Sequence, residues 1–502
     1  GLGDVYKRQV LAGLLIVLGI LATGCSKKKD VNMAGKTIYP VSSYEETLEI
    51  TMGDVMPFYD EGVMNIYHLQ NSRGSNSMYY HPISRLTTTD FLTYTDEGIV
   101  INYEEQYDSP DAAIGTGSFI KDKDGKYHCF YTGHNAAEGT GLPHIEVIRH
   151  AVSDDQKQWT KLEDFNLYGD CDDFRDPYVY YDEIEAIYYM LVTTRVNGTG
   201  VIKQYASEDL SADDSQWRDN GIFFANDDGT YNMECPSYVE LNGIYYLAYS
   251  EQGDNRITHY RYKTSPEGAW KRFERDSIDS SGFYAGRLEK AGDELYAFAW
   301  CAELTGGSVG EFDWGGNLVV HKIVQSSGGE LNAVIADSVL KEISSPVEYK
   351  TIDNQAVENL DFTKEAFRAV CLQKLNRGIT RLSFRFSIEE RTGNFGLTFN
   401  VKGANHRLGS SVIAFEPETN TLTCYNDVSN IIRYGDSLCS VPFVYSKNKE
   451  YEVNVMIDGE IMTVYLDSSV AMTVRLSGVS NKNFAFFSNK AATGFRGIQF
   501  YE

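Results

Sequence analysis

The sequence predicts an all-β protein in which a five-bladed β-propeller is followed by a C-terminal β-sandwich. Three observations support this fold class. The chain of 502 residues contains 35 tyrosines and 25 phenylalanines but only 11 prolines, and aromatic residues favour strands. A hairpin pattern recurs along the first part of the chain, up to residue 345. From about residue 350 onward, apolar and polar residues alternate.

The recurring unit is an apolar entry, a short strand, a turn and a second strand rich in Tyr, Phe and Leu. Its copies occupy residues 56–69, 117–133, 176–194, 235–250 and 283–300. Glycines mark most of the turns: Gly62, Gly125, Gly243 and Gly292. A second hairpin follows each copy, and two hairpins per unit make the four-stranded blades of a propeller. The alternative is a β-sandwich joined to an unrelated sheet domain, but the matching register of the units favours the propeller.

The last part of the chain reads as alternating strands, such as LSFRFSI, GNFGLTFNV and YEVNVMIDGEIMTVYLD. Period-two alternation broken by turns is typical of a two-sheet sandwich. We therefore expect a propeller domain at residues 46–345 and a sandwich domain at residues 346–502.

The N-terminal segment reads as a secretory signal. The basic pair Lys7-Arg8 precedes an apolar run, Val10 to Ala22, which is shorter than the ~20 residues that a membrane-spanning helix needs. The run ends in LATGC, which resembles a bacterial lipobox and would make Cys25 the lipidated first residue of the mature chain. We expect a lipoprotein signal peptide at 1–25, a tether at 26–45, and an extracytoplasmic protein lipid-anchored in the membrane at the bacterial cell surface. The alternative is an uncleaved membrane anchor.

Charge and cysteine spacing exclude several function classes. The formal net charge is −26, and an acidic field repels phosphate backbones, so we expect no nucleic-acid partner. That field does not oppose a neutral substrate such as a sugar. The eight cysteines form no CxxC motif and no Cys/His cluster, so we expect no metal site and no cofactor. The spacing does not say which cysteines pair, and the oligomeric state stays open.

Carboxylates stand at the head of several expected inner strands. The first strand of each propeller blade lines the central channel, so residues at the same end of these strands converge. These places hold Asp54, Gly117-Ser118, Asp176, Glu234 and Tyr284. Acids that share one cavity repel each other and lose hydration, a cost that folding does not require and that chemistry commonly explains. The alternative is that the acids cap strands or bind a cation.

Two motifs carry a resemblance to glycoside hydrolase family 32, the β-fructosidases that cleave fructans and sucrose. Phe174-Arg175-Asp176-Pro177 matches the family's Arg-Asp-Pro motif, and Met233-Glu234-Cys235-Pro236 matches its Glu-Cys-Pro motif. We expect Pro236, which cannot donate to a ladder, to open a strand. Gly117-Ser118 resembles the family's Ser-Gly-Ser segment. His81 and Gln70 fall where the family has a Trp-Gly-His motif and a substrate-contacting Gln.

The resemblance covers nearly the whole mature chain and implies retaining hydrolysis of an oligo- or polysaccharide. In that mechanism Asp54 is the nucleophile, Glu234 the acid and base, and Asp176 the transition-state stabiliser. The resemblance also implies a set of substrate-binding residues: Gln70, His81, Ser118 and Arg175. From the residues alone, Arg175 equally fits an ion pair between blades, and His81 and Gln70 fit ordinary buried positions. Trp300 and Trp314 lie near the channel end and are candidates for stacking on a sugar.

The sequence departs from the family around the expected nucleophile. It reads Met52-Gly53-Asp54-Val55-Met56-Pro57 where the family has Trp-Met-Asn-Asp-Pro-Asn-Gly. Two rival functions therefore remain open. A member of the related family 43, which cleaves arabinan or xylan, would share the propeller and the acids. A non-catalytic, glycan-binding lipoprotein of the cell surface would not need three intact acids.

Overall fold

The computed structural model describes most of the chain after residue 30. The described residues are 31–32, 35–44, 48–71, 81–226, 229–253, 256–304, 312–364, 367–375, 378–401, 409–426, 437–476, 479 and 482–502. Nearly all regular structure in them is β-strand, and the helical segments there are the short η1 (Asp214–Gln216) and α2 (Asp337–Glu342). The expected signal peptide at 1–25, with Cys25, lies outside the described residues. None of the helices within them is long and apolar enough to span a membrane.

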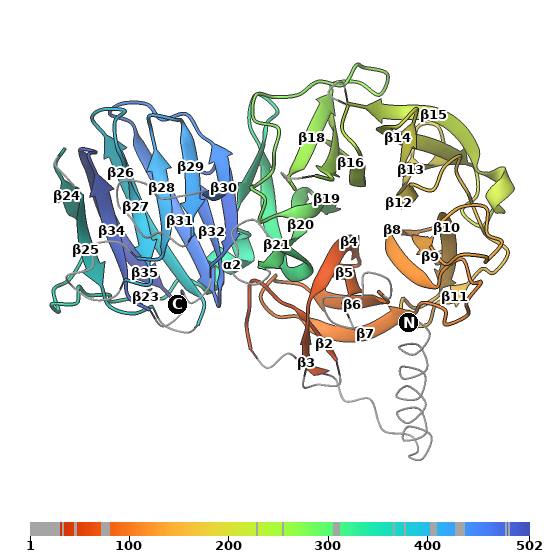
Figure 1. Cartoon of the computed structure of the whole chain (residues 1–502), viewed down its shortest axis with the longest axis horizontal. Coiled ribbons are helices and arrows are strands. Elements are labelled where there is room, and N and C mark those ends of the chain that lie inside the picture. The colour runs from red at the N-terminus through yellow and green to blue at the C-terminus, as the bar shows by residue number, and fades with distance from the viewer. Residues whose placement is uncertain are drawn as a thin grey trace, which may run out of the picture.

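The first part of the chain forms groups of antiparallel strands arranged around a common centre (Figure 1). The groups are β4 (Met52–Asp60), β5 (Val63–Gln70), β6 (Ile83–Thr88) and β7 (Thr95–Ile101); β8 (Ala113–Lys121), β9 (Tyr127–His134), β10 (Glu146–Ser153) and β11 (Thr160–Lys161); β12 (Phe174–Asp182), β13 (Ile187–Val196), β14 (Thr199–Ser207) and β15 (Arg218–Ala225); β16 (Met233–Leu241), β17 (Ile244–Glu251) and β18 (Thr258–Lys263); β19 (Tyr284–Ala291), β20 (Glu294–Leu304), β21 (Phe312–Gln325) and β22 (Leu331–Val334). The first expected hairpin of each unit is present as an antiparallel pair, from β4–β5 to β19–β20. The fourth group departs from the expected four strands: it has three among the described residues, and β18 contacts residues 271 and 277 only through isolated bridges. The first and last groups join where Met52 of β4 pairs with Gly316 of β21.

The N-terminal residues add short strands to this part. They are β1 (Val31–Asn32), which pairs with β7, and the hairpin β2 (Ser42–Tyr44) and β3 (Leu48–Ile50). Ile38 and Tyr39 are buried, and the Thr37 hydroxyl donates to Asp458 Oδ2 over 2.6 Å. Residues 37–42 of the expected tether are therefore packed into the protein.

A β-bulge interrupts the innermost strand of every group. In β12 the ladder with β13 is broken between Arg175 and Tyr178, and in β16 it is broken between Glu234 and Ser237. The same break occurs in β4, β8 and β19. Pro236 lies in its bulge, after β16 has already begun at Met233, so the expectation that it opens the strand is wrong. A proline is tolerated there because the extra bulge residue is left out of the ladder.

The last part of the chain folds into two facing sheets. One holds β23 (Pro346–Val347), β24 (Leu360–Phe362), β26 (Thr380–Ile388), β31 (Glu450–Asp458), β32 (Ile461–Leu466), β33 (Val470–Arg475) and β35 (Thr493–Tyr501); the other holds β25 (Arg368–Leu372), β27 (Asn394–Phe399), β28 (Ser411–Glu416), β29 (Thr421–Tyr425), β30 (Ser437–Pro442) and β34 (Phe484–Asn489). The alternation in β26 turns Leu382, Phe384 and Phe386 inward, where Phe384 packs against Phe486 of the opposite sheet. This is the two-sheet packing that the alternating pattern predicts.

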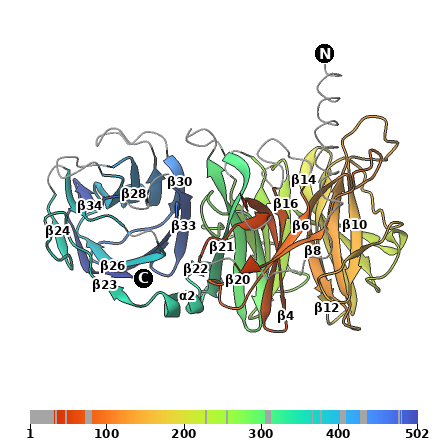
Figure 2. The same cartoon turned by 90° about the horizontal axis from the view of Figure 1, so that it is seen from below.

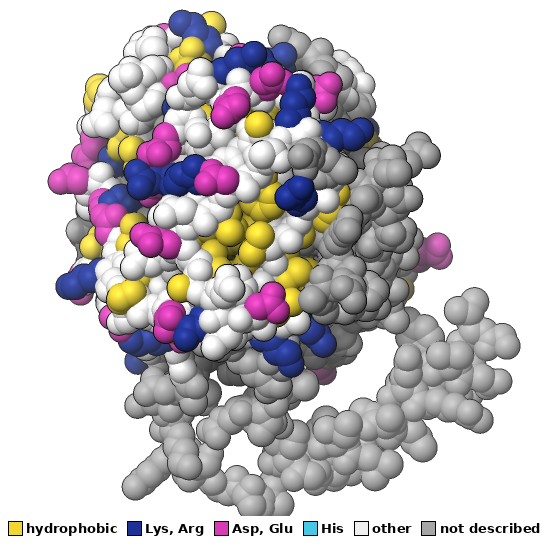
Figure 3. Space-filling view, turned by 90° about the vertical axis from the view of Figure 1, so that its left-hand side faces the viewer, with side chains coloured by type: hydrophobic (Ala, Val, Ile, Leu, Met, Phe, Trp, Pro, Cys, Tyr) yellow, Lys and Arg dark blue, Asp and Glu magenta, His cyan; other side chains and the backbone are white. Residues whose placement is uncertain are grey.

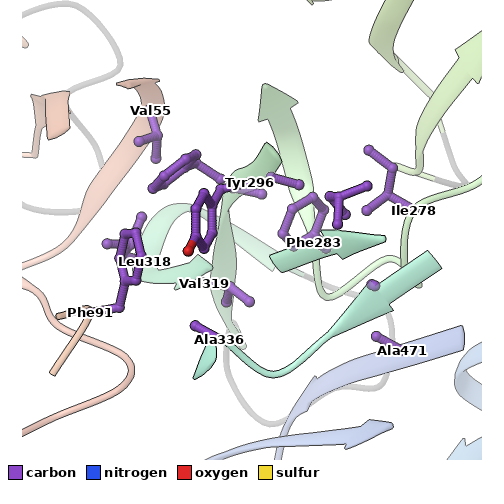
Figure 4. Packing of buried hydrophobic residues seen from close by; sticks show 14 of the residues in the cluster. Val55, Phe91, Ile278, Phe283, Tyr296, Leu318, Val319, Ala336 and Ala471 are labelled. Carbon is purple, nitrogen blue, oxygen red and sulfur yellow. The ribbon is translucent and has the colours of Figure 1, made fainter. Parts of the chain in front are cut away.

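The sandwich lies beside the propeller sheets in two perpendicular views (Figures 1 and 2). A single hydrophobic cluster runs from Val55 and Phe91 through Tyr296 to Ala471 of β33 (Figure 4). Next to it, buried Asp279 accepts hydrogen bonds from the Thr473 backbone N–H at 2.7 Å and the Thr473 hydroxyl at 2.6 Å. The two parts therefore share a core and a polar network. The outer end of the sandwich carries basic and acidic side chains interspersed with some hydrophobic ones (Figure 3).

Candidate active site

A cavity of about 650 Å³ opens where the innermost strands begin. Asp54 of β4, Asp176 of β12 and Glu234 of β16 all line it. Three carboxyl groups that are far apart in the sequence therefore face one space, as expected from their positions at the strand heads. The wall also includes Arg175, His81, Thr116, His134, Glu146, Asp173, Tyr231, Gln252, Arg256, Tyr284 and Trp314.

The bulges place these side chains in two layers. Asp54 and Asp176 are the first residues of their bulges, and both have positive φ angles, 41° and 57°. Such a conformation is strained for residues other than glycine, and it aims their side chains away from the regular ladder. Glu234 lies one residue before its bulge, at the place that Arg175 and Tyr284 take in the strands on either side. The three acids are thus not equivalent, because Glu234 belongs to the other layer.

Glu234 is held between its equivalents in the neighbouring strands. The Arg175 guanidinium donates from Nη2 to Glu234 Oε1 over 2.9 Å. The Tyr284 hydroxyl donates to Glu234 Oε2 over 2.5 Å. Both carboxyl oxygens are therefore fixed in direction, while the side chain keeps 16% of its exposure. An acid that is positioned this firmly and still faces a cavity is suited to proton transfer.

Asp54 is partly buried in the cavity wall. The Trp300 indole donates to its Oδ1 over 3.2 Å. Burial raises the pKa of Asp54 to about 6, and the charge of Glu234 adds to that effect. The Trp300 hydrogen bond and the charges of Arg287 and Arg256 act in the opposite direction on this pKa. At a pKa of about 6, Asp54 is mostly ionised at pH 7.

Asp176 is almost fully buried and anchored through backbone groups. Its Oδ2 accepts the Cys235 backbone N–H at 2.9 Å, and its own backbone N–H donates to the Thr132 hydroxyl at 2.9 Å. Burial raises the pKa of Asp176 to about 7, against the lowering effect of Arg175 and with support from the charges of Glu234 and Asp54. The proton affinity of Asp176 therefore depends on the charges of Glu234 and Asp54.

Arg175 combines the two roles that the sequence left open. It forms ion pairs with Glu146 of β10 at 3.2 Å and with Asp173 at 2.9 Å, besides its bond to Glu234. It therefore links neighbouring groups of strands. It also lines the cavity.

Of the other expected substrate-binding residues, the structure places one in the cavity wall and two outside it. His81 lines the cavity and stacks on Trp314, with ring centroids 4.0 Å apart. Gln70 does not reach it, because its buried amide donates to Ser42 and accepts from Ser84. Ser118 does not line it either, because it lies two residues further along β8 than Thr116.

The hydroxyl of Ser118 accepts the Val179 backbone N–H at 2.9 Å. Thr116, the bulge residue two positions earlier, lines the cavity instead. Ser118 and Gln70, both expected to bind substrate, are therefore buried and bonded elsewhere, and the structure does not bring them into the cavity wall. Of the two tryptophans, Trp314 lines the cavity, whereas Trp300 is fully buried.

The altered nucleophile motif has a structural counterpart. A Cβ atom on Gly53 would lie 2.5 Å from Cζ2 of Trp314. The indole of Trp314 therefore fills the space that a side chain at position 53 would need, and glycine is required there. Sequence reasoning did not find this pair, since the two residues lie on β4 and β21 at opposite ends of the propeller sequence. Arg256, whose guanidinium lies 4.6 Å from the Tyr284 ring centroid, carried no sequence signal either.

The two all-β parts and the three carboxyl groups around one open cavity fit the class of glycoside-cleaving enzymes. The comparison of sequences agrees: residues 56–333 match the family described as "Glycosyl hydrolases family 32 N-terminal domain". This match covers more than half of the chain, and the chain belongs to that family. This match identifies the chain as a member of family 32 rather than family 43. The matched region begins at residue 56, just after Asp54.

Individual relatives are distant. Sucrose-6-phosphate hydrolase of Vibrio alginolyticus is 26% identical over 188 residues, which are 37% of this chain and 36% of that protein. The enzyme of the same name from Lactococcus lactis is 26% identical over 181 residues, 35% of this chain and 37% of that protein. The alignments thus span little more than a third of these curated relatives.

Solved structures share the fold along nearly the entire chain. The sucrose-6-phosphate hydrolase of Lactobacillus gasseri superposes with a TM-score of 0.70 at 18% identity, over 93% of this chain and 92% of that one. A GH32 beta-fructofuranosidase of Bombyx mori gives 0.69 at 16% identity, over 92% and 93%. The exo-inulinase of Aspergillus awamori gives 0.68 at 14% identity, over 95% and 98%. At these identities the likeness shows the common fold.

Proposed function

We propose that this protein is a retaining β-fructosidase that hydrolyses β-fructosidic bonds in fructans or sucrose-type oligosaccharides. The observation that carries the proposal is the joint position of Asp54, Asp176 and Glu234 around one cavity, in a chain of family 32. The relatives named above as sucrose-6-phosphate hydrolase, beta-fructofuranosidase and exo-inulinase support the substrate class.

In the proposed reaction, a carboxylate oxygen of Asp54 attacks the anomeric carbon of the fructosyl unit. The bond to the leaving oxygen breaks, and Glu234 gives that oxygen its proton. Glu234, now ionised, takes a proton from water, which attacks the same carbon and releases fructose and Asp54. Each step inverts the anomeric carbon, so the configuration is retained overall.

The contacts of Glu234 and Asp176 fit these roles. Arg175 stabilises the carboxylate that Glu234 becomes after it loses its proton, and Tyr284 keeps the second oxygen aligned. Asp176 lies in the same layer as Asp54 and supplies negative charge as the sugar ring becomes positive. Hydrogen bonds from both neighbouring strands hold Glu234 in one orientation, which supports its assignment as the acid.

We further propose the domain architecture of the protein and its location in the cell. Each antiparallel group, from β4–β7 to β19–β22, is one blade of a five-bladed propeller at residues 46–345, and residues 346–502 form the sandwich domain. Residues 1–25 are a lipoprotein signal that leaves the protein lipid-anchored at the bacterial cell surface. Fatty-acid labelling of the full chain tests the anchor: we expect label on the wild type and none on Cys25→Ala, and label on both variants would refute it.

The test of the activity is sugar release by purified residues 26–502 from sucrose, sucrose 6-phosphate, inulin, levan and an aryl arabinofuranoside, beside Glu234→Ala. We expect fructose from at least one fructoside and almost none from the variant. Preference for sucrose 6-phosphate would narrow the substrate to phosphorylated sugars. Arabinose release, or no release from any substrate, would refute the proposal.

A further inference from the structure

A second and larger cavity, of about 950 Å³, lies at the other end of the innermost strands. Strands β12 and β16 contribute to both cavities. Asp176 and Glu234 stand at the beginning of these strands, and Tyr180 and Tyr238 follow four residues later. A strand rises about 3.3 Å per residue, so Tyr180 and Tyr238 lie roughly 13 Å along the strands from Asp176 and Glu234.

Aromatic side chains form the wall of this second cavity, which we call the tyrosine groove. They are Tyr178, Tyr180, Tyr181, Tyr189, Tyr238, Tyr245 and Phe223. The rings touch one another. Tyr180 and Tyr238 have centroids 5.0 Å apart, Tyr238 and Tyr245 stack at 6.0 Å, and Phe223 meets Tyr238 edge-on at 5.3 Å. This mutual contact holds the rings in place, so a ligand that packs on them costs little ordering of side chains.

The polar groups between the rings determine which ligand charge the groove favours. Carboxylates and amides line the groove: Asp182, Glu183, Glu185, Gln204, Asn220, Glu240, Glu267 and Glu289. Of the two lysines in the wall, Lys263 is buried and already donates to the Pro266 carbonyl. An acidic wall disfavours phosphates and other anions. It offers many acceptors to a neutral ligand with hydroxyl groups.

The groove is open to solvent, so its aromatic side chains are available to contact a ligand. The aromatic side chains in its wall are only partly buried, and Ile222 and Ile184 at its margin are 52% and 86% exposed. Flat rings with hydroxyl groups, set among acceptors, suit a ligand that has both apolar C–H faces and hydroxyl groups. Sugars have that chemistry.

We propose that the tyrosine groove is a non-catalytic binding site for neutral oligosaccharides, which holds a polymeric substrate at a distance from the catalytic acids. The proposal rests on the proposed function for the identity of the sugar. A single chain of fructan contacts both cavities only if it is long, so the groove acts on polymers and leaves sucrose-sized substrates unaffected.

The test uses the full mature chain carrying Glu234→Gln, which keeps substrate intact. We titrate it calorimetrically with a fructo-oligosaccharide, and in parallel with arabino- and xylo-oligosaccharides. We expect two binding sites, of which Tyr180→Ala removes one by weakening it at least about tenfold, as is typical for loss of a central aromatic contact. Glu183→Arg, an exposed substitution that spares the ring packing, should weaken the same site. Tyr501→Ala in the sandwich is the matched control and should change nothing.

Kinetics of otherwise wild-type enzyme separate the groove from the active site. Tyr180→Ala and Glu183→Arg should raise KM for inulin or levan and leave kcat/KM for sucrose unchanged. A single binding site in the Glu234→Gln protein, or groove variants that bind and hydrolyse polymer like the wild type, would overturn the inference. If the wild type hydrolyses no fructoside, the proposed function fails, while titration with the other oligosaccharides still tests the groove.

Discussion

Tyr284 donates a 2.5 Å hydrogen bond to Glu234, the residue that occupies Tyr284's own place in the preceding innermost strand. Arg175 occupies the same place one strand earlier and binds the other carboxyl oxygen. The arrangement follows from the fold, because strands around a common centre bring equivalent positions into contact. The orientation of the proposed acid is therefore set by the register of three bulged strands.

Removal of the Tyr284 hydroxyl should impair proton transfer without disturbing substrate binding. We expect Tyr284→Phe to lower kcat about 10- to 100-fold with little change in KM, because a hydrogen bond to a charged group is worth about 1.5–3 kcal/mol. Steady-state kinetics on the best fructoside measure this. Tyr425→Phe, which removes a hydroxyl from Glu416 in the sandwich, is the control and should behave as wild type. An equal loss in both variants would contradict the role of Tyr284.

The acid limb of the pH profile should report Asp54 and Asp176. Burial raises the pKa of Asp54 to about 6 and that of Asp176 to about 7, and the proposed reaction needs both groups ionised. We therefore expect kcat/KM to fall as the pH drops through about 7 and then about 6. A limb near the ordinary range for aspartate, about pH 4, would contradict the raised pKa of these groups.

Substitution of Arg287 should shift the acid limb of the kcat/KM profile along the pH axis. It is 1% exposed, and its guanidinium nitrogens find no hydrogen-bond partner among the described residues. Its positive charge lowers the pKa of Asp54, so removing the charge should raise that pKa. We expect Arg287→Met to move the acid limb to higher pH and Arg287→Lys to restore it partly. An unchanged limb in a folded Arg287→Met protein would show that the charge does not act on Asp54.

Ionised Asp54 should destabilise the fold. The folded-state pKa of about 6 lies above the unfolded value of about 4, so the folded state holds the proton more tightly. Stability is then unaffected below about pH 4 and falls as pH rises through 6, by about 3 kcal/mol in total. Asp54→Asn should therefore raise Tm at pH 8 and leave it nearly unchanged at pH 4. Thermal unfolding of both proteins across this range measures it, and a difference independent of pH would contradict the account.

Gly53 and Trp314 should behave as a coupled pair. Gly53→Ala places a Cβ atom 2.5 Å from the indole, which should displace Trp314 and its stacking partner His81 and lower kcat/KM. Adding Trp314→Ala removes the clash, so the double variant should be no less stable than Trp314→Ala alone. Unfolding curves of the four proteins in this cycle provide the measurement. Additive effects of the two substitutions would show that the contact does not restrict position 53.

The sequence allowed prediction of the strands and of the acids, because periodicity and motifs are local signals. It placed Asp54, Asp176, Glu234, Arg175 and His81 in one cavity correctly. It failed at Ser118 because of register: Thr116, two residues earlier, is the residue in the β8 bulge, and it is Thr116 that lines the cavity.

Other parts of the cavity wall depend on pairings that no local pattern encodes. Trp314 comes from β21, which returns to β4 from the far end of the first part of the chain. Arg256 lies after β17, and its guanidinium contacts the ring of Tyr284, a residue far from it in the sequence. Both contacts follow from how the sheets close around the centre.

The central claim is that Asp54 becomes bonded to the sugar while Glu234 moves the proton. Its most direct test is mass spectrometry of Glu234→Gln, quenched in acid during reaction with an aryl fructoside whose good leaving group needs no proton, followed by peptide mapping. The account predicts one added fructosyl residue on the peptide that contains Asp54, and none in Asp54→Asn. An adduct on Asp176, or turnover of the aryl fructoside with no adduct on any peptide, would contradict it.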